Sequence, residues 1–249
     1  MDSLTELQAA MRACRLCLEA GHEIVPGAVF RGSTGAEVLL IGQAPGVTEV
    51  EAKRPFNATS GTRLFQWLGE AGWYEDEFRA RHYMTAVTKC YPGKGGINAV
   101  GKGDRVPSKA EQALCRPFLE REIALVRPKL MILVGGLAIK LLYPAKMKLN
   151  EVVGTAVYFP PSALTNPVNF NFDDALPVTV NGNRLSVIGL PNTDYRSPNT
   201  DNGSPTIGRL VVPLPHPSGA SLWPNKPANK ALIAKAIQIL HTVRIAWNL

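Results

Sequence analysis

The sequence has 249 residues, of which 45% are hydrophobic and 19% are charged. These proportions exclude a disordered chain, a coiled coil and a collagen-like protein, and the length suffices for a substantial core. The formal net charge of +7 indicates an acidic partner, for which nucleic acid is the usual candidate. The longest apolar run, residues 130–139, is too short to cross a bilayer. Because the N-terminal residues lack the apolar core of a secretory signal, we expect a cytoplasmic protein.

Strands and helices alternate along most of the chain. The hydrophobic pattern predicts, in chain order, a helix over 4–20, strand 37–42, helix 60–71, strand 83–87, helix 108–126, strand 129–134, helix 135–142, strands 185–189 and 209–214, and helix 227–246. The helix over 108–126 opens on a capping box formed by Ser108 and Glu111. Such alternation is typical of a parallel sheet with helices on both faces.

Two regions interrupt this pattern. Residues 92–104 contain five glycines and predict a loop, and residues 158–207 are rich in Asn, Pro, Thr and Gly. The second region contains an Asn-Gly pair at 181–182, which predicts a hairpin. Residues 96–103 approach the P-loop pattern but lack its final Ser or Thr, so we do not expect a nucleotide site there. We expect one domain over 1–249, with insertions at about 93–103 and 158–207.

Four cysteines are candidates for a metal centre. Cys14 and Cys17 form a C-x-x-C pair, whereas Cys90 and Cys115 stand alone. Disulfides are not expected in a reducing cytosol. Four thiolates suit either a tetrahedral zinc site or an iron–sulfur cluster. Spacing alone does not decide between these metals, and four separate buried thiols are the third alternative.

Two segments follow predicted strands at the place where open parallel sheets bind ligands. Residues 42–46 (GQAPG) come directly after the strand over 37–42, and their glycines and proline allow a sharp turn close to a ligand. His216 follows the strand over 209–214, where an imidazole can donate a proton or stabilise an anion. The alternative for each segment is an ordinary structural turn.

These features join further motifs that occur in a defined order between residues 14 and 218. The motifs are Cys14-Arg-Leu-Cys17, residues 38–46 with Glu49, residues 54–57 with Ser60 and Gly61, residues 87–90, residues 104–107 with Glu111, residues 115–119, residues 128–135, and His216-Pro-Ser218. Together they resemble the uracil-DNA glycosylase superfamily, and most of all its iron–sulfur type, family 4. The resemblance implies a three-layer α/β/α sandwich with a central, mainly parallel, four-stranded sheet. It also implies a [4Fe-4S] cluster on the four cysteines, which favours iron over zinc.

The resemblance implies an enzyme that flips a damaged base out of DNA and hydrolyses its N-glycosidic bond. Phe56 is expected to stack on the base, His216 to hydrogen-bond the leaving oxygen, and Gln43 to position the attacking water. No lysine in the matched motifs indicates a lyase, so we expect a monofunctional enzyme. The base pocket is expected to be lined by Gly42, Ala44, Pro45, Gly46 and Ala86. The expected DNA contacts are Ser60, Ser218 and Arg105, with Leu222, or else Trp223, as a wedge between bases.

Two positions depart from the family 4 pattern. Gln43 stands where glutamate is usual, and an amide can orient water but cannot act as a base; Glu49 is the nearest carboxylate that could compensate. Ala86 stands where an asparagine reads the uracil edge. The candidates to replace that asparagine are Thr85, Thr88, Asn98 and Asn192. Loss of an amide that hydrogen-bonds the uracil edge lowers the discrimination between uracil and other bases. We therefore expect activity on uracil or another deaminated base.

Two hypotheses therefore remain. The first is a monofunctional DNA glycosylase, for which Phe56 and His216 argue. The second is a catalytically weak DNA-binding relative with a structural iron–sulfur cluster, for which Gln43 and Ala86 argue. Under either hypothesis we expect a monomer that binds damaged DNA in the cytoplasm, at the nucleoid.

Overall fold

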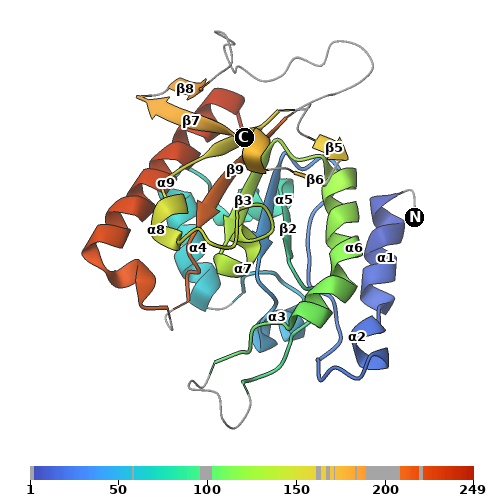
Figure 1. Ribbon diagram of the computed structural model, residues 1–249. Helices are drawn as coiled ribbons and strands as arrows, with labels where there is room; N and C mark the ends of the chain where they lie inside the picture. Colours follow the sequence, from blue (N-terminus) through green and yellow to red (C-terminus); the bar gives the residue numbers. More distant parts are fainter. Residues whose placement is uncertain are drawn as a thin grey trace.

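The computed structural model describes residues 3–57, 59–95, 103–160, 164–166, 169–170, 172–182, 184–188, 208–218 and 221–249. A seven-stranded sheet of order β2-β1-β3-β9-β4-β7-β8 runs through the molecule, with helices on both faces (Figure 1). The predicted α/β architecture is confirmed. The predicted number of four strands is wrong, because residues 157–187 add three more strands to the same sheet.

Four parallel strands form the part of the sheet that was predicted. They are β1 (Val38–Gly42), β2 (Tyr83–Ala86), β3 (Leu130–Val134) and β9 (Arg209–Leu214). All four are buried along their whole lengths, which explains their continuous apolar sequences. Gly42 pairs with Ala86, and Val134 pairs with Leu214. The segments that follow these strands therefore meet at one edge of the sheet.

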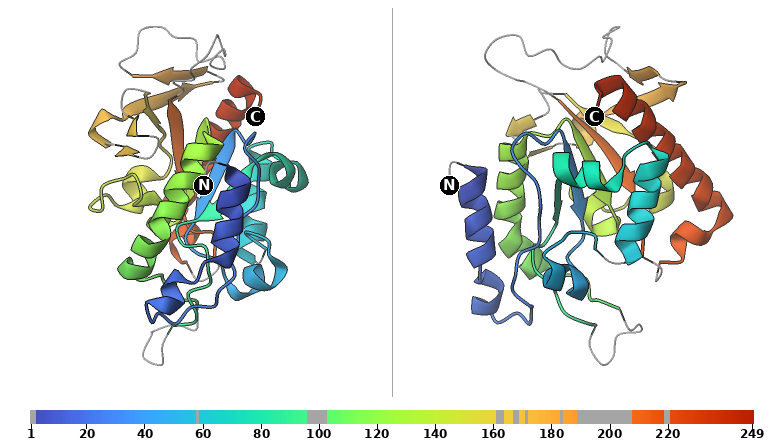
Figure 2. Two further views of the ribbon diagram at one scale, coloured as in Figure 1. Left: turned by 90° about the vertical axis from the view of Figure 1, so that its right-hand side faces the viewer. Right: turned by 180° about the vertical axis from the view of Figure 1, so that it is seen from behind.

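Helices cover the sheet from two sides. α1 (Leu4–Ala13) and α6 (Lys109–Val126) lie on one side, and α4 (Thr59–Glu70), α5 (Glu75–Arg81) and α9 (Pro227–Trp247) lie on the other (Figures 1 and 2). α6 begins at the predicted capping box, where the Glu111 amide donates to Ser108 Oγ at 3.2 Å. The single helix predicted over 4–20 is instead two helices, because the chain turns at Cys14 and Arg15 before α2 (Leu16–Glu19).

The three additional strands run antiparallel. β4 (Val157–Phe159) pairs with β9, and β7 (Leu176–Asn181) with β8 (Arg184–Val187) forms a hairpin on the far side of β4. The predicted Asn-Gly turn is confirmed, since Gly182 adopts a φ of 60° between paired Asn181 and Arg184. Thr242 Oγ1 of α9 donates to the Gly182 carbonyl at 3.4 Å, which ties the hairpin to the helix.

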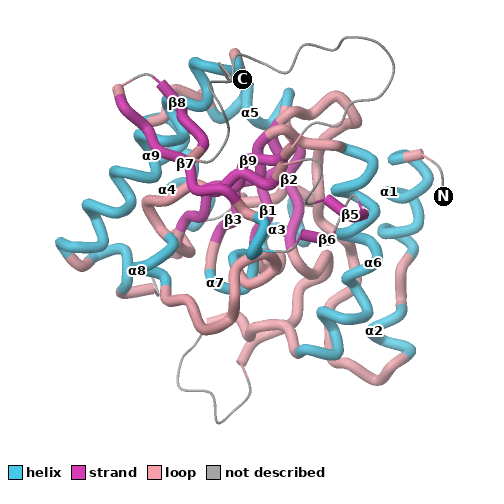
Figure 3. The backbone as a smooth tube through the Cα atoms, turned by 45° about the horizontal axis from the view of Figure 1, so that its top comes forward, coloured by secondary structure: helices cyan, strands magenta, loops and turns pink. Residues whose placement is uncertain are grey.

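The remaining elements are short. They are α3 (Val47–Ala52), α7 (Gly136–Ile139), α8 (Leu149–Val152), the 3₁₀ turns Phe172–Asp174 and Trp223–Asn225, and a separate two-stranded sheet of β5 (Leu164–Asn166) and β6 (Asn169–Phe170) (Figure 3). α7 is shorter than the helix predicted over 135–142. Within the described ranges, no helix has the length and hydropathy to span a membrane. The segment resembling a P-loop lies largely outside the described residues, at 96–102.

Candidate active site

A cavity of about 630 Å³ opens where the four parallel strands end. This volume is within the range of small-molecule sites, and the position is the one that open parallel sheets favour. The cavity is lined by the predicted residues Gly42, Gln43, Ala44, Pro45, Gly46, Phe56, Ser60, Ala86, Arg105, His216 and Ser218. The predicted wedge, Leu222, follows the lining residue Ser221 and has 74% of its surface exposed. The structure thus brings the predicted residues together around one opening.

The Phe56 ring covers the end of β1. A Cβ atom on Gly42 would lie 2.8 Å from the ring Cζ, so only glycine allows this contact. Phe56 itself has a φ of 53°, in the left-handed region that non-glycine residues seldom adopt. The close contact with Gly42 fixes the ring against the floor of the cavity, where one aromatic face can stack on a planar ligand.

His216 presents a defined hydrogen-bond donor to the same cavity. The Ser218 amide donates to His216 Nδ1 at 3.2 Å, so Nδ1 is the acceptor and the proton of the neutral ring is on Nε2. Burial lowers the pKa of His216 below its ordinary value of 6.5. The ring packs on Gly135, where a Cβ would lie 3.1 Å from its Cδ2 and where φ is 88°. At neutral pH the site therefore contains an uncharged N–H donor in a fixed orientation.

Two carboxylates also line the cavity. Glu49 accepts the amide of Gly46 at 2.5 Å and the amide of Phe56, so its oxygens join the two loops of the pocket. Burial raises the pKa of Glu49. Asp104 accepts the Tyr91 hydroxyl at 2.8 Å through Oδ1, and its Oδ2 lies 3.2 Å from the position of a Cβ on Gly46. Asp104 was not among the residues predicted to line the pocket, because only the fold brings residue 104 beside residue 46.

Ala86 lines the cavity with a methyl group at the position where the resemblance implied an asparagine. Thr85 does not replace it, because its hydroxyl already bonds Glu122 and the Lys89 ammonium. Thr88 lies beside the cysteines rather than in this cavity. The other two candidates, Asn98 and Asn192, are outside the described residues. The Gln43 carboxamide lines the cavity and makes no hydrogen bond with any described residue, so it can bind water or a ligand.

The four cysteines line a second cavity, between α1, α2, the segment after β2 and the first half of α6. All four are free thiols. The Lys89 amide donates to Cys115 Sγ at 3.4 Å, and the Gly27 amide hydrogen-bonds Cys90. Among the described residues, Thr88 Oγ1 is buried there without a hydrogen-bond partner. No group of three or more His, Cys, Asp or Glu side chains in the described ranges is placed to hold a metal ion.

The chain is similar to known proteins over most of its length. Residues 30–241 match the family described as the uracil DNA glycosylase superfamily. The chain belongs to this superfamily. Proteins named Type-4 uracil-DNA glycosylase are similar to it. That of Sulfurisphaera tokodaii is 28% identical over 187 residues, which cover 67% of this chain and 78% of the relative. The protein of Pyrobaculum aerophilum is 29% identical over 153 residues, which cover 61% of this chain and 70% of the relative. The protein of Thermotoga maritima is 25% identical over 158 residues, which cover 63% of this chain and 73% of the relative.

Membership makes the protein a hydrolase of the DNA glycosylase class. In this glycosylase a buried ion pair lies between the cavity of Phe56 and His216 and the cysteine-lined cavity. Lys89 Nζ is 2.6 Å from Glu122 Oε2 and donates to the Ala86 carbonyl at 2.6 Å. Glu122 also accepts the Tyr83 hydroxyl at 2.9 Å. Because Cys90 follows Lys89 directly, this network joins the wall of the cavity to the cysteine-lined site.

Arg105 has a different environment from the one predicted for a DNA contact. Its guanidinium donates to both oxygens of Glu111, at 2.7 and 2.5 Å, and to the Glu23 carbonyl at 2.9 Å. These hydrogen bonds lower the pKa of Glu111 to about 2. The ion pair fixes the start of α6 and neutralises the charge of Arg105. A phosphate would have to compete with Glu111 for this side chain.

Proposed function

We propose that the protein hydrolyses the N-glycosidic bond of uracil, or of another deaminated base, after the base has flipped from DNA into the cavity between Phe56 and His216. Water is the nucleophile, and there is no lyase step. One observation carries this proposal. An aromatic face and a neutral histidine donor line the same cavity of about 630 Å³ in a member of a DNA glycosylase superfamily.

The chemistry follows from the charges that develop as the bond breaks. The sugar becomes an oxocarbenium-like cation and the base leaves as an anion. The bond between the sugar carbon and the base nitrogen breaks, and His216 Nε2–H donates to the carbonyl oxygen of the base on which negative charge develops, a contribution of about 3 kcal/mol for a donor of this kind. The carboxylates of Glu49 and Asp104 give the cavity negative charge that favours the cationic sugar. The Gln43 carboxamide orients the attacking water.

The residues that line the pocket determine which bases the enzyme is expected to release. The methyl side chain of Ala86 cannot form a hydrogen bond with the edge of a base, and the Thr85 hydroxyl already donates to Glu122. A site without a side chain that hydrogen-bonds the edge of the base discriminates weakly between bases of similar shape. Gly46 has no side chain to exclude substituents at C5 of a pyrimidine. We therefore expect release of more than one deaminated base.

The rim of the cavity supplies the DNA contacts. Ser60 in the first turn of α4 and Ser218 after His216 are the proposed phosphate contacts. Leu222 is the proposed wedge, because it is exposed whereas Trp223 packs against the core. Arg105 has no DNA contact in this proposal. The enzyme is proposed to act as a monomer on DNA of the cytoplasm, at the nucleoid.

A [4Fe-4S] cluster is the proposed occupant of the cysteine-lined cavity, bound by Cys14, Cys17, Cys90 and Cys115. Four free cysteines that line one cavity are the ligand set that such a cluster requires. The amides of Lys89 and Gly27 stabilise charged sulfur, and the Thr88 hydroxyl is a further donor. The bound cluster would supply a cross-link that clamps α1 and α2 to α6.

The function is tested by base release from double-stranded oligonucleotides that carry uracil, hypoxanthine, xanthine or thymine opposite each possible base of the complementary strand. The protein is purified anaerobically, and abasic sites are cleaved by alkali. Release of uracil and at least one other deaminated base is the expected result. Release of uracil alone would contradict the proposed loose specificity. If no base is released by protein that binds DNA, the second hypothesis, a catalytically weak DNA-binding relative, replaces the first.

The pH dependence tests the protonation state of His216. Because burial lowers its pKa below 6.5, the neutral form of the ring predominates at pH 6.5 and its share rises further above that pH. The single-turnover rate should therefore not fall between pH 6.5 and about pH 8. A protonated histidine acting as the acid would instead lose about tenfold in rate per pH unit above its pKa. Such a decline would overturn the assignment of a neutral donor.

The cluster proposal is tested by replacing Cys115 with serine and measuring bound iron and visible absorption. We expect iron content and the visible band to fall, together with the melting temperature, because one ligand and the clamp are lost. Ala113→Ser, an exposed position on the same helix, is the matched control and should change none of these. Anaerobically purified wild-type protein that contains zinc and no iron would contradict the proposal.

A further inference from the structure

Phe56 holds its ring over the cavity from a backbone conformation that is strained for a phenylalanine. With a φ of 53°, the residue lies in the left-handed region, where a non-glycine residue costs free energy. Such conformations persist when the surrounding structure over-determines them, and they cluster at ligand sites. The loop of Pro55 and Phe56 must therefore be held in place by contacts with neighbouring elements.

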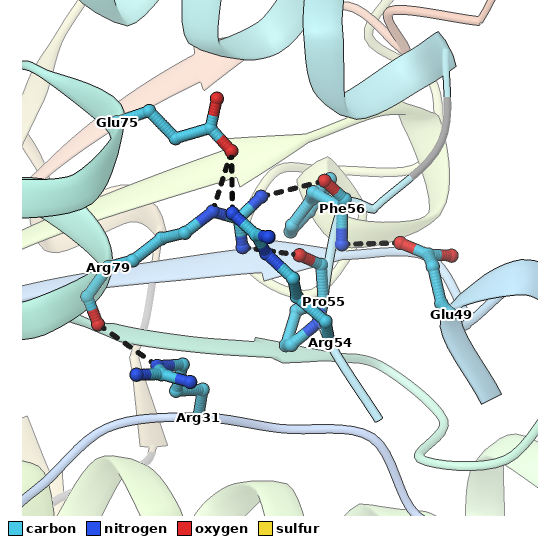
Figure 4. Close-up of polar contacts among 7 residues, drawn as sticks. All are labelled: Arg31, Glu49, Arg54, Pro55, Phe56, Glu75 and Arg79. Carbon is cyan, nitrogen blue, oxygen red and sulfur yellow. Dashed lines mark hydrogen bonds and ion pairs between the residues drawn. The ribbon is translucent and has the colours of Figure 1, made fainter. Parts of the chain in front are cut away.

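Three residues from three different helices hold this loop, and Figure 4 shows two of them, Glu49 and Arg79. Glu49 at α3 accepts the Phe56 amide. Arg79 on α5 donates from Nη1 to the Pro55 carbonyl at 2.7 Å and from Nη2 to the Phe56 carbonyl at 2.8 Å. Gly61 on α4 lies so close that a Cβ would be 1.9 Å from the Phe56 carbonyl oxygen. The loop cannot relax toward any of these neighbours.

Arg79 is the one charged residue of the three that does not line the cavity. Only 5% of its surface is exposed, and it is not among the residues that line the base pocket. Its Nε donates to Glu75 at 2.8 Å, and its guanidinium lies 4.3 Å above the Phe65 ring. Glu75 also accepts Arg54 at 3.1 Å. Glu75 and Phe65 therefore fix the plane of the guanidinium, whose remaining N–H groups point at two consecutive carbonyls.

We propose that Arg79 is a positioning residue for base recognition. Its planar guanidinium holds the Pro55 and Phe56 carbonyls, and thereby keeps the Phe56 ring in the orientation in which a flipped base can stack on it. Lysine cannot replace this fork, because a single ammonium does not present two parallel donors in fixed geometry. The inference rests on the proposed function only in taking Phe56 as the stacking ring. Arg79 itself touches neither DNA nor base.

A double-mutant cycle between Arg79 and Phe56 tests the proposal in the holoenzyme. The substrate is a single-stranded oligonucleotide with one uracil, and the readouts are kcat, KM and binding affinity by fluorescence anisotropy. Arg79→Gln should lower kcat/KM by about 5-fold to 100-fold, the range for loss of one base–aromatic stack. In a Phe56→Ala background it should cost less than about threefold, because the ring it positions is gone. Arg79→Lys should lie between wild type and Arg79→Gln.

Arg81→Gln is the matched control, since Arg81 is an exposed arginine on the same helix, and it should leave kcat/KM unchanged. The same loss from Arg79→Gln with and without the Phe56 ring would overturn the proposal. If Arg79→Gln does not fold, Arg79→Lys carries the test, and wild-type kcat/KM in that variant would overturn it too. If the wild type binds DNA but releases no base, the proposed function fails, and the same cycle on affinity still decides the role of Arg79.

Discussion

Replacing His216 with alanine should lower the single-turnover rate of base release by a factor of about 10²–10³, the usual effect of losing one donor to a developing anion. Affinity for uracil-containing DNA should change little, because the donor acts mainly in the transition state. The effect is large because the neutral ring is held by the Ser218 amide and by its packing on Gly135. Rates of base release and affinities by anisotropy are measured side by side.

His22→Ala is the matched control for this experiment, since it removes an imidazole that is not among the residues lining the cavity and should not change the rate. The assignment of His216 would be wrong if His216→Ala released base at nearly the wild-type rate. An equal loss of rate and of DNA affinity would show that His216 binds DNA rather than stabilising the leaving base.

The second large effect concerns the buried ion pair. Lys89→Ala should lower the free energy of unfolding by about 3–5 kcal/mol, because Glu122, with 0% of its side chain exposed, loses its counter-ion. This is a large fraction of the 5–15 kcal/mol that stabilises a typical domain. The Ala86 carbonyl also loses its donor. Urea unfolding of the anaerobically purified wild type and variant measures the change.

The double variant Lys89→Met with Glu122→Leu is the control that separates an unpaired charge from lost packing. Replacing both partners removes the uncompensated charge, so this variant should regain most of the stability. A loss of less than about 1 kcal/mol in Lys89→Ala would show that water or another cation compensates Glu122. In that case the network would not be the rigid link between the pocket wall and the cysteines.

The strands that sequence patterns predicted best are those buried on both faces. β1, β3 and β9 are continuous apolar runs, and their predicted limits agree with the structure to within one residue. β7 and β8 instead alternate between half-buried and exposed residues, and β4 has only three residues. Their apolar signal is weak because one face of this part of the sheet is open. The Asn-Gly turn nevertheless predicted this hairpin, with a strand over 185–189, whereas the number of four strands in the sheet came from the family resemblance.

Some residues of the site could be predicted from the sequence and others could not. Gly42–Gly46 and His216 were predictable because the ends of parallel strands meet at one edge, whatever the rest of the fold. Asp104 and Arg79 were not, because their contacts with Gly46 and Phe56 depend on how loops pack across the sheet edge. In sequence, Glu75 and Arg79 have the spacing of an ordinary surface ion pair on a helix. Only the fold shows that Arg79 is buried and faces two carbonyls.

The central claim is that a flipped base occupies the cavity between Phe56 and His216. A crystal structure of the His216→Ala variant bound to an oligonucleotide with one uracil tests it most directly. We predict the uracil ring stacked on Phe56 beside Ala86, with Gln43 near the sugar and Leu222 in the gap left in the DNA. A uracil that stays in the base stack, or that binds outside this cavity, would contradict the account.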